Sequence, residues 1–447
     1  MIRSVIFCFA LVILFSVIVH VKPQVCYGMN QYDRCSKNTA CGCLPIINTN
    51  QTAICGILEV NCSQFIPCKS LTNECDLLGA VCVQHPGCND LPVCYPLSMG
   101  DERSCPITRN WINTGSMKYS RYMHQAIALV DGKVLVMGGI GDKAIAHKTA
   151  ELYDGSVGIW TATGNMTYAR FGHTASALKN GKILVTGGNG NGKYLNTAEL
   201  YDPSTRTWTT TGNMSCTRFG HRASVLANGK VLVTGGDGRT QYLNTAELYD
   251  PSTETWTLTD SMKSARYRHT ATVLTNGKVL VTGGYADVYM NTTELYDPTT
   301  ETWTTVAAMN KAISLHTASL LSNGKVLITG GVTPVADTLK NALLFDPTTE
   351  SWTSTSNMNH ERHTHTASVL PTGEVLVTGG FYTTNTIGYS STVLNSAELY
   401  NPTTETWTSV SNMTTARGMH TAFVLVNRKV LIAGGSNNES INSAEIY

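Results

Sequence analysis

The sequence predicts an all-β protein with a large repeated domain and a small disulfide-rich one, on three observations. A unit with the same landmarks recurs seven times between residue 106 and the end of the chain. Charged residues make up only 14% of the chain, against about 25% in ordinary soluble domains. Thr, Ser, Asn and Gly take their place, as suits short strands and turns. Twelve of the 14 cysteines lie between Cys26 and Cys105.

Residues 1–24 contain one Arg close to the N-terminus, Arg3, which is followed by an apolar stretch from Ser4 to Val21. This arrangement is typical of a secretory signal peptide, which we expect to be cleaved near its end. The alternative is an uncleaved membrane anchor, because the apolar stretch is about the shortest that spans a bilayer. In both cases the remaining chain is expected to be extracytoplasmic.

Residues 25–105 are predicted to form a disulfide module in an oxidising compartment. Zinc is disfavoured, because the only close pair is Cys41 and Cys43 and no paired C-x-x-C knuckles occur. The pairing of the bridges stays open, and Cys216 is left as a single thiol outside the module. The cysteines expected in bridges are Cys26, Cys35, Cys41, Cys43, Cys55, Cys62, Cys68, Cys75, Cys82, Cys88, Cys94 and Cys105.

Three landmarks define the repeated unit of residues 106–447. The first is a glycine pair, whose first member is residue 138, 187, 235, 283, 330, 379 or 434. The second is Trp, at residues 111, 160, 208, 256, 303, 352 and 407. The third is an aromatic residue in an ELYDP-like segment, at residues 153, 201, 249, 296, 345, 400 and 447. The period of 47 to 49 residues, with one of 55, predicts a propeller of four-stranded blades.

These units resemble kelch repeats, which share the glycine pair, the Tyr and the Trp after a short gap. The resemblance covers residues 108–447 and implies a seven-bladed β-propeller. The strand of Trp111 precedes the first complete unit, whereas the last unit stops at SAEIY without a Trp strand. We therefore expect the N-terminal strand to complete the last blade, so that the ring has no open edge. The resemblance says little about function, because kelch propellers serve many.

Chain length varies in only one part of the unit. Trp and the first glycine are 27 residues apart in every unit, whereas the second glycine and the aromatic residue are 14, 13, 13, 12, 14, 20 and 12 apart. The variable loops join the second strand to the third and emerge on one face, which we call the variable face. Because variable loops on a rigid scaffold commonly carry binding, we predict that this face binds the ligand. The candidate ligand-binding residues are Phe381, Tyr382, Tyr389, Tyr285, His269 and His420.

A His, an Arg and a Glu recur at fixed places in the unit. The His begins each innermost strand. A structural role suits seven such residues better than metal binding does, because one metal ion needs only three or four ligands. The Arg stands three residues before the His in six units, and the Glu stands near the aromatic residue in six units. In the fifth unit Ile313 replaces the Arg, and we assign Leu344 to the position of the Glu. The joint loss predicts partly buried ion pairs, including Arg266 with Glu294 and Arg218 with Glu247.

The kelch resemblance also leads to galactose oxidase, a seven-bladed propeller with kelch-like units. It implies a copper site in which a Tyr precedes one of the recurring histidines that begin the innermost strands. We call these the ring histidines; they are His124, His173, His221, His269, His316, His365 and His420. None of the residues before the ring histidines is a Tyr, so we expect no copper and no other cofactor. Those residues are Met123, Gly172, Gly220, Arg268, Leu315, Thr364 and Met419.

The leading prediction is a secreted, non-catalytic binding or adhesion protein whose partner is an extracellular protein or a glycan. The alternative is a galactose oxidase-like extracellular oxidoreductase that acts on carbohydrates. The net charge of +1 favours neither nucleic acid nor an anionic membrane surface as a partner. Seven sequons are candidate glycosylation sites. Their asparagines are Asn50, Asn61, Asn165, Asn213, Asn291, Asn412 and Asn438.

Overall fold

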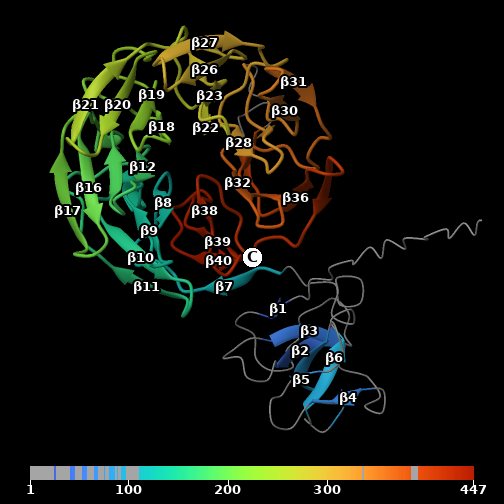
Figure 1. Cartoon of the computed structure of the whole chain (residues 1–447). Coiled ribbons are helices and arrows are strands. Elements are labelled where there is room, and N and C mark those ends of the chain that lie inside the picture. Colours follow the sequence, from blue (N-terminus) through green and yellow to red (C-terminus); the bar gives the residue numbers. More distant parts are fainter. Residues whose placement is uncertain are drawn as a thin grey trace, which may run out of the picture. The chain divides into compact units, whose positions relative to one another are not determined.

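The computed structural model describes residues 25–26, 41–45, 53–57, 65–68, 75, 80–85, 88, 92–96, 110–334, 337–383 and 391–447. The chain divides into two compact units, Met1–Arg109 and Asn110–Tyr447 (Figure 1). The predicted signal peptide lies outside the described residues. Within the described ranges, no helix is both long enough and apolar enough to cross a membrane.

The N-terminal unit contains two small antiparallel sheets. The first has the order β1-β3-β2 and consists of β1 (Val25–Cys26), β2 (Cys41–Pro45) and β3 (Ala53–Ile57). The second has the order β4-β6-β5 and consists of β4 (Ile66–Pro67), β5 (Ala80–Gln84) and β6 (Pro92–Pro96). The rings of Phe65, His85 and Tyr95 pack together beside the second sheet.

Disulfides hold this small unit together, as the sequence predicts. Cys68 is bonded to Cys82 and Cys75 to Cys94, and Cys88 is also disulfide-bonded. A unit this small buries little apolar surface, so covalent links supply stability that its core cannot. The side chains of the other predicted bridge cysteines lie outside the described residues. The described disulfides indicate an oxidising environment.

The second unit is a seven-bladed propeller of four-stranded antiparallel sheets, which confirms the predicted fold class (Figure 1). Blade 1 comprises β8 (Gln125–Ala128), β9 (Val134–Met137), β10 (Ala150–Asp154) and β11 (Ile159–Ala162). Blade 2 comprises β12 (Thr174–Ala177), β13 (Ile183–Thr186), β16 (Ala198–Asp202) and β17 (Thr207–Thr211). Blade 3 comprises β18 (Arg222–Val225), β19 (Val231–Thr234), β20 (Ala246–Asp250) and β21 (Thr255–Thr259).

The remaining blades follow the same order from the axis outward. Blade 4 comprises β22 (Thr270–Val273), β23 (Val279–Thr282), β26 (Thr293–Asp297) and β27 (Thr302–Val306). Blade 5 comprises β28 (Thr317–Leu320), β29 (Val326–Thr329), β30 (Ala342–Asp346) and β31 (Ser351–Ser354). Blade 6 comprises β32 (Thr366–Val369), β33 (Val375–Thr378), β36 (Ala397–Asn401) and β37 (Thr406–Ser409). Blade 7 comprises β38 (Thr421–Val424), β39 (Val430–Ala433), β40 (Ala444–Ile446) and β7 (Ile112–Thr114).

Three of the variable loops form short hairpins, and a fourth contains a single helical turn. The hairpins are β14 (Asn189–Gly190) with β15 (Lys193–Tyr194), β24 (Tyr285–Ala286) with β25 (Val288–Tyr289), and β34 (Phe381–Thr383) with β35 (Ser391–Val393). The helical turn is the 3-10 helix η4 (Asp142–Ala144) in blade 1. These four variable loops therefore carry structure of their own.

The two ends of the propeller chain close the ring in blade 7. Strand β7 pairs antiparallel with β40, with Ile112 opposite Ile446. The Nε1 of Trp111 also donates to the carbonyl of Ser411 at 2.7 Å. Every other Trp of the repeat makes the equivalent bond to the preceding blade, for example Trp256 to Gly212 at 2.8 Å. The closing blade therefore repeats the contacts of the others.

The hydrophobic core lies between adjacent blades. All four residues of each second strand are buried, as in β23 (Val279–Thr282), because a neighbouring blade covers each face. The ring of Tyr249 packs on Trp256 with centroids 5.1 Å apart, and its hydroxyl bonds to Thr211 of the preceding blade at 2.8 Å. The repeated aromatic residues thus join blades to one another.

The glycine pair is required where two blades meet. Gly283 and Gly284 have φ values of 59° and 101°, which disfavour residues with a Cβ. A Cβ on Gly283 would also lie 2.6 Å from the carbonyl oxygen of Ile313 in the next blade. The pair therefore fixes both the turn and the close approach, and it is not a phosphate-binding loop.

A closed ring of seven backbone hydrogen bonds surrounds the propeller axis on the variable face. In each unit the residue before the ring His donates its N–H to the same residue of a neighbouring blade, at 3.0 to 3.4 Å. All seven of these residues have a positive φ, between 47° and 62°. They are Met123, Gly172, Gly220, Arg268, Leu315, Thr364 and Met419. The conformation turns each N–H toward the preceding blade, so the ring holds the inner strands in register around the axis.

Candidate functional site

The recurring Arg forms a buried network with the recurring Glu. In blade 4 the Nη2 of Arg266 lies 2.6 Å from the Oε1 of Glu294, and both side chains are almost fully buried. The same guanidinium donates to the carbonyls of Gly283 and Thr292 at 2.8 and 3.2 Å. The other carboxylate oxygen accepts the N–H of Lys263, in the connection from blade 3, at 2.7 Å. Each pair therefore fastens an inter-blade connection to the blade that follows it.

The structure brings together this pair in six blades and buries it more deeply than the expected partial burial. The pairs are Arg121–Glu151, Arg170–Glu199, Arg218–Glu247, Arg266–Glu294, Arg362–Glu398 and Arg417–Glu445. Desolvation lowers the pKa of Arg266, and the charge of Glu294 opposes that shift. These arginines are consequently unavailable to a ligand.

Blade 5 replaces the pair with apolar residues, at a position one residue earlier than the sequence assignment. Strand β30 places Leu343 opposite Ile328, as Glu294 lies opposite Val281 in blade 4. Leu343, not Leu344, is therefore the counterpart of the Glu. It lies with Ile313 in an apolar cluster beside a void of only about 10 Å³. Both charges are absent from this blade, so no buried charge is left without its partner.

Six of the seven ring histidines bond to a Thr of the preceding blade, and burial keeps all seven neutral. The Nε2 of His316 lies 3.0 Å from the Oγ1 of Thr270 and 3.2 Å from that of Thr282. Desolvation, together with the charges of Arg222 and Arg266, lowers the pKa of His316 to about 3. The pKa of His221 and of His420 is also lowered to about 3, mainly by desolvation.

Two of these histidines, His269 and His420, are candidate ligand-binding residues, and both are engaged in hydrogen bonds to the preceding blade. His269 is fully buried, with its Nε2 3.0 Å from the Oγ1 of Thr234. His420 forms part of a cavity wall, but its Nε2 is bonded to Thr366 at 2.9 Å and Thr378 at 3.1 Å. Both side chains are therefore used to join blades.

One ring histidine lacks this partner. His173 is 1% exposed, and neither of its ring nitrogens has a hydrogen-bond partner. In blade 1, Gln125 and Met137 stand where four other blades carry two threonines and the remaining two blades carry one. The repeat is thus broken beside the axis, at a position that the sequence analysis did not single out.

A cavity of about 260 Å³ lies at the axis on the variable face. It is bounded by the seven residues of the hydrogen-bonded ring, by five of the ring histidines, and by Phe219. Three further residues on its wall follow a ring histidine directly: Gln125, Arg222 and Thr317. The lining lies outside the variable loops: Gln125, Arg222 and Thr317 are the first residues of β8, β18 and β28, and the other lining residues directly precede inner strands.

Two arginines give the cavity its charge. Arg222 is only partly exposed and donates to the carbonyl of His221 at 3.2 Å. Burial and the nearby charge of Arg268 lower the pKa of Arg222 to about 10. Arg268 lies over the ring of Tyr267, with its Cζ 5.1 Å from the ring centroid. Burial, together with the charge of Arg268, lowers the pKa of His363 to about 4.

Sequence reasoning missed both arginines as site residues. Arg222 stands where five other units carry Thr, and Arg268 stands where two units carry Gly. The search for blade-specific residues was confined to the variable loops, whereas these two lie within the constant part of the repeat. A comparison of each repeat position across the seven units would have found them.

The aromatic residues of the loops pack mainly on one another. Tyr285 contacts Tyr267, Tyr242 and Tyr289, and Tyr242 stacks on Tyr267 with centroids 5.1 Å apart. This tyrosine cluster extends across the variable loops of blades 3 and 4, next to Arg268.

The loop of blade 6 holds the other predicted aromatic residues. Phe381 stacks on His363, with ring centroids 5.8 Å apart. Tyr382 lies in β34 and is partly exposed, whereas Tyr389 lies outside the described residues. Only part of this candidate surface is therefore placed.

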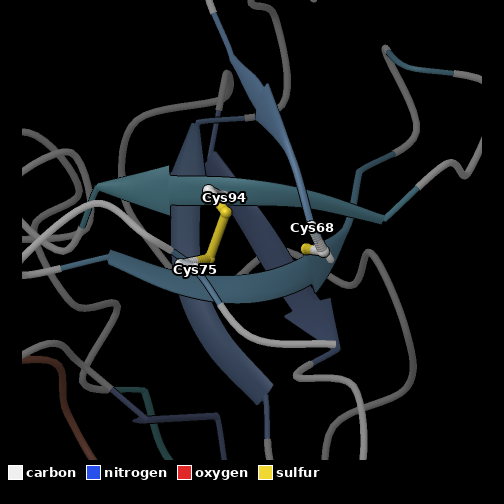
Figure 2. A group of neighbouring side chains, drawn as sticks. All are labelled: Cys68, Cys75 and Cys94. Atoms are coloured by element: carbon white, nitrogen blue, oxygen red, sulfur yellow. A yellow bond between two sulfur atoms is a disulfide. The ribbon is translucent and has the colours of Figure 1, made fainter. Parts of the chain in front are cut away.

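One group of possible metal ligands occurs among the described residues, in the N-terminal unit (Figure 2). It consists of Cys68, Cys75 and Cys94, whose sulfur atoms lie within 4.8 Å of one another. Figure 2 shows Cys75 bonded to Cys94, and the sulfur of Cys68 is bonded to Cys82. All three sulfurs are engaged in disulfides, so the group is not a metal site.

The described sequons differ in what their side chains do. Asn165, Asn213, Asn412 and Asn438 are exposed. The Nδ2 of Asn291, in contrast, donates to the carbonyl of Met309 at 3.0 Å and is partly buried. That engagement counts against glycan attachment at this residue. Asn50 and Asn61 lie outside the described residues.

Comparisons with known proteins agree with the fold. The KLHDC2/KLHL20/DRC7 Kelch-repeats domain matches residues 123–331, and the Attractin/LZTR1 beta-propeller matches residues 288–446. With its seven blades and recurring residues, the chain is a kelch-repeat β-propeller protein. No curated protein matches the chain in sequence.

Among solved structures, the chain is similar to a fungal alcohol oxidase of the AA5 family in complex with copper. The TM-score is 0.62 and the sequence identity 18%, over 76% of each chain. At this identity the likeness shows the propeller fold and not the activity. The copper site implied by the galactose oxidase resemblance does not fit the residues at the axis. The seven residues before the ring histidines include no Tyr, and six of the histidines bond to Thr through Nε2.

Proposed function

We propose that the protein is a secreted, non-catalytic binding protein whose variable face holds an extracellular protein or glycan. The kelch-repeat fold supports a protein-binding scaffold. The disulfides and the apolar N-terminal segment support an extracellular location. Non-catalytic action is supported by the cavity lining, in which the histidines are neutral and no Asp, Glu or Cys occurs among the described residues.

The observation that carries this proposal is the location of the residues that the blades do not share. The residues that recur in the blades form inter-blade contacts, such as Arg266 with Glu294 and Trp256 with Gly212. The blade-specific residues gather on the variable face, in the axial cavity and in the loops around it. A rigid scaffold that presents different side chains on one face suits recognition.

The test is binding of the purified, secreted protein to arrays of extracellular proteins and glycans. In one variant Gly-Gly replaces residues 384–390, which shortens the blade 6 loop and leaves the pairing of β34 with β35 in place. As a control, Val130→Ser alters a 93% exposed residue in a turn on the opposite face. We expect a specific array signal that the loop variant loses or reduces at least tenfold, and that Val130→Ser retains. A signal that the opposite-face change reduces, while the loop change does not, would contradict the assignment.

A further inference from the structure

We propose that the axial cavity binds the carboxylate of an acidic sugar, a uronic or sialic acid, between Arg222 and Arg268. This inference rests on the proposed function and names the ligand class of the same face. Two cations, an amide without a partner and an apolar wall meet in a space of about 260 Å³.

The charge of the cavity has no counter-ion in the described protein. Neither Arg222 nor Arg268 forms an ion pair there, and the two undescribed segments of the propeller, 335–336 and 384–390, contain no Asp or Glu. The ring histidines are neutral, so they neither add to this charge nor balance it. Like charges held together away from water are unfavourable unless an anion joins them. A carboxylate suits the planar, bidentate donor geometry of a guanidinium.

The backbone offers little to an anion at this place. The N–H groups of the seven ring residues all donate to neighbouring blades. An anion at the axis must therefore be held by side chains, and the two arginines are the cations that line the cavity.

Neutral polar groups favour a sugar over an acidic amino-acid side chain. The side-chain amide of Gln125, whose oxygen and nitrogen make no hydrogen bond within the described protein, lies on the cavity wall. An Asp or Glu side chain would bring a carboxylate and methylene groups, and would leave these groups unsatisfied. A sugar ring brings hydroxyls that can both donate and accept, which such polar groups require.

The rest of the wall suits the C–H faces of a sugar ring. Met123, Leu315 and Met419 are apolar and belong to the hydrogen-bonded ring, and Phe219 lies beside them. The tyrosine cluster adjoins Arg268 through Tyr267, so a second sugar unit could pack on an aromatic face.

The fold itself does not require either arginine. Arg268 has a φ of 54°, at a position where Gly172 and Gly220 serve in the two preceding blades. A side chain there costs about 1 kcal/mol or more relative to Gly. Arg222 occupies a position that carries Thr in five other blades. Arg268→Gly and Arg222→Thr are therefore substitutions that the propeller already tolerates elsewhere.

The experiment is calorimetric titration of the full secreted chain with glucuronic acid, N-acetylneuraminic acid, neutral glucose and a short Glu-rich peptide. The variants are Arg222→Thr, Arg268→Gly and the control Arg239→Gly, which removes an exposed Arg with a φ of 77° from the same face. We expect at least one acidic sugar to bind, each cavity variant to weaken it at least tenfold, and Arg239→Gly to leave it unchanged. The methyl glycosides of the same acidic sugars separate two sources of the ligand. If they bind as well as the free sugars, the ligand is a terminal residue of a glycan chain; if they bind more weakly, the ligand is a free sugar.

Three results would overturn the inference: no acidic sugar binds, binding survives both cavity variants, or the peptide binds through the two arginines and the sugars do not. Thermal unfolding of each variant excludes misfolding as the cause of lost binding. The array experiment separates this inference from the proposed function. An array ligand that depends on the blade 6 loop but not on the arginines would leave the function standing and refute the acidic-sugar site.

Discussion

Two sets of arginines in one propeller differ in their partners. Six of them, typified by Arg266, lie at equivalent positions of the blades, are fully buried and each contact a Glu. The other two, Arg222 and Arg268, occur in single blades and face an axial cavity without a carboxylate among the described residues. An Arg that recurs together with its Glu partner is structural, whereas an Arg that occurs in only one blade is available to a ligand.

This difference gives a general criterion for a repeat protein. A residue that recurs in nearly every unit stabilises contacts between units, because each unit must solve the same packing problem. A residue peculiar to one unit, at a position where the others agree, has no such reason to be there. The His, Trp and Tyr positions fall into the first class, whereas Gln125 and Arg222 fall into the second. Arg268 also occurs in one unit only, at a position where the residue varies between units.

The largest expected effect concerns the recurring histidines. Their pKa lies well below 6.5 in the folded chain and near 6.5 in the unfolded chain, so between these values only the unfolded chain takes up protons. The free energy of unfolding should therefore fall as pH decreases from about 6.5 toward 3. Each histidine contributes up to about 1.4 kcal/mol per pH unit in that range. Urea unfolding between pH 7 and pH 5 measures this slope, and a stability that is constant over the range would contradict the structural role.

The next effect concerns one ion pair. Arg266→Ile leaves Glu294 buried and unpaired, and should lower the free energy of unfolding by about 3 to 5 kcal/mol. Adding Glu294→Leu copies blade 5, where Ile313 and Leu343 occupy the two positions, and should recover most of the loss. Urea unfolding of the two single variants and the double variant measures the coupling. Additive losses would mean that the pair does not act as a unit.

The smallest expected effect concerns the asparagines of the sequons, which also divide into a recurring, hydrogen-bonded residue and exposed ones. Asn291 belongs to a set whose Nδ2 donates to a Met carbonyl, as Asn244 does to Met262 at 3.0 Å. Asn165, Asn213 and Asn412 are exposed. In secreted protein we expect glycans on these three and little or none on Asn291, and Asn291→Ala should cost about 1 kcal/mol of stability. Mass spectrometry of glycopeptides measures occupancy, and a fully modified Asn291 would refute the distinction.

The sequence was sufficient for the propeller, because identical spacing in seven units reports the same local geometry seven times. It also located the Arg–Glu pairs, since both residues disappear together from blade 5. It failed where the information lies between blades, since the burial of His269 depends on a Thr from the preceding blade. The assignment of Leu344 has a different cause: Leu343 stands two residues before Phe345, as Glu294 stands before Tyr296, so the spacing itself identifies Leu343 as the counterpart.

The cavity could not be predicted from the sequence for a related reason. Gln125, Arg222 and Arg268 come from three different blades and meet only because the ring closes. Nothing in their local sequence indicates that they line a common space. The aromatic residues of the loops were easier to find, but many of them pack on one another rather than on a free surface.

The central claim is that the recurring residues stabilise the propeller and the blade-specific arginines do not. Urea unfolding of the double variant Arg222→Thr/Arg268→Gly tests it most directly, because it requires no ligand. The account predicts a free energy of unfolding equal to or up to about 1 kcal/mol above that of the unaltered protein, since an unbalanced charge and a strained side chain are removed. A loss of about 3 kcal/mol or more, comparable to breaking a buried ion pair, would show that these arginines support the fold and would contradict the account.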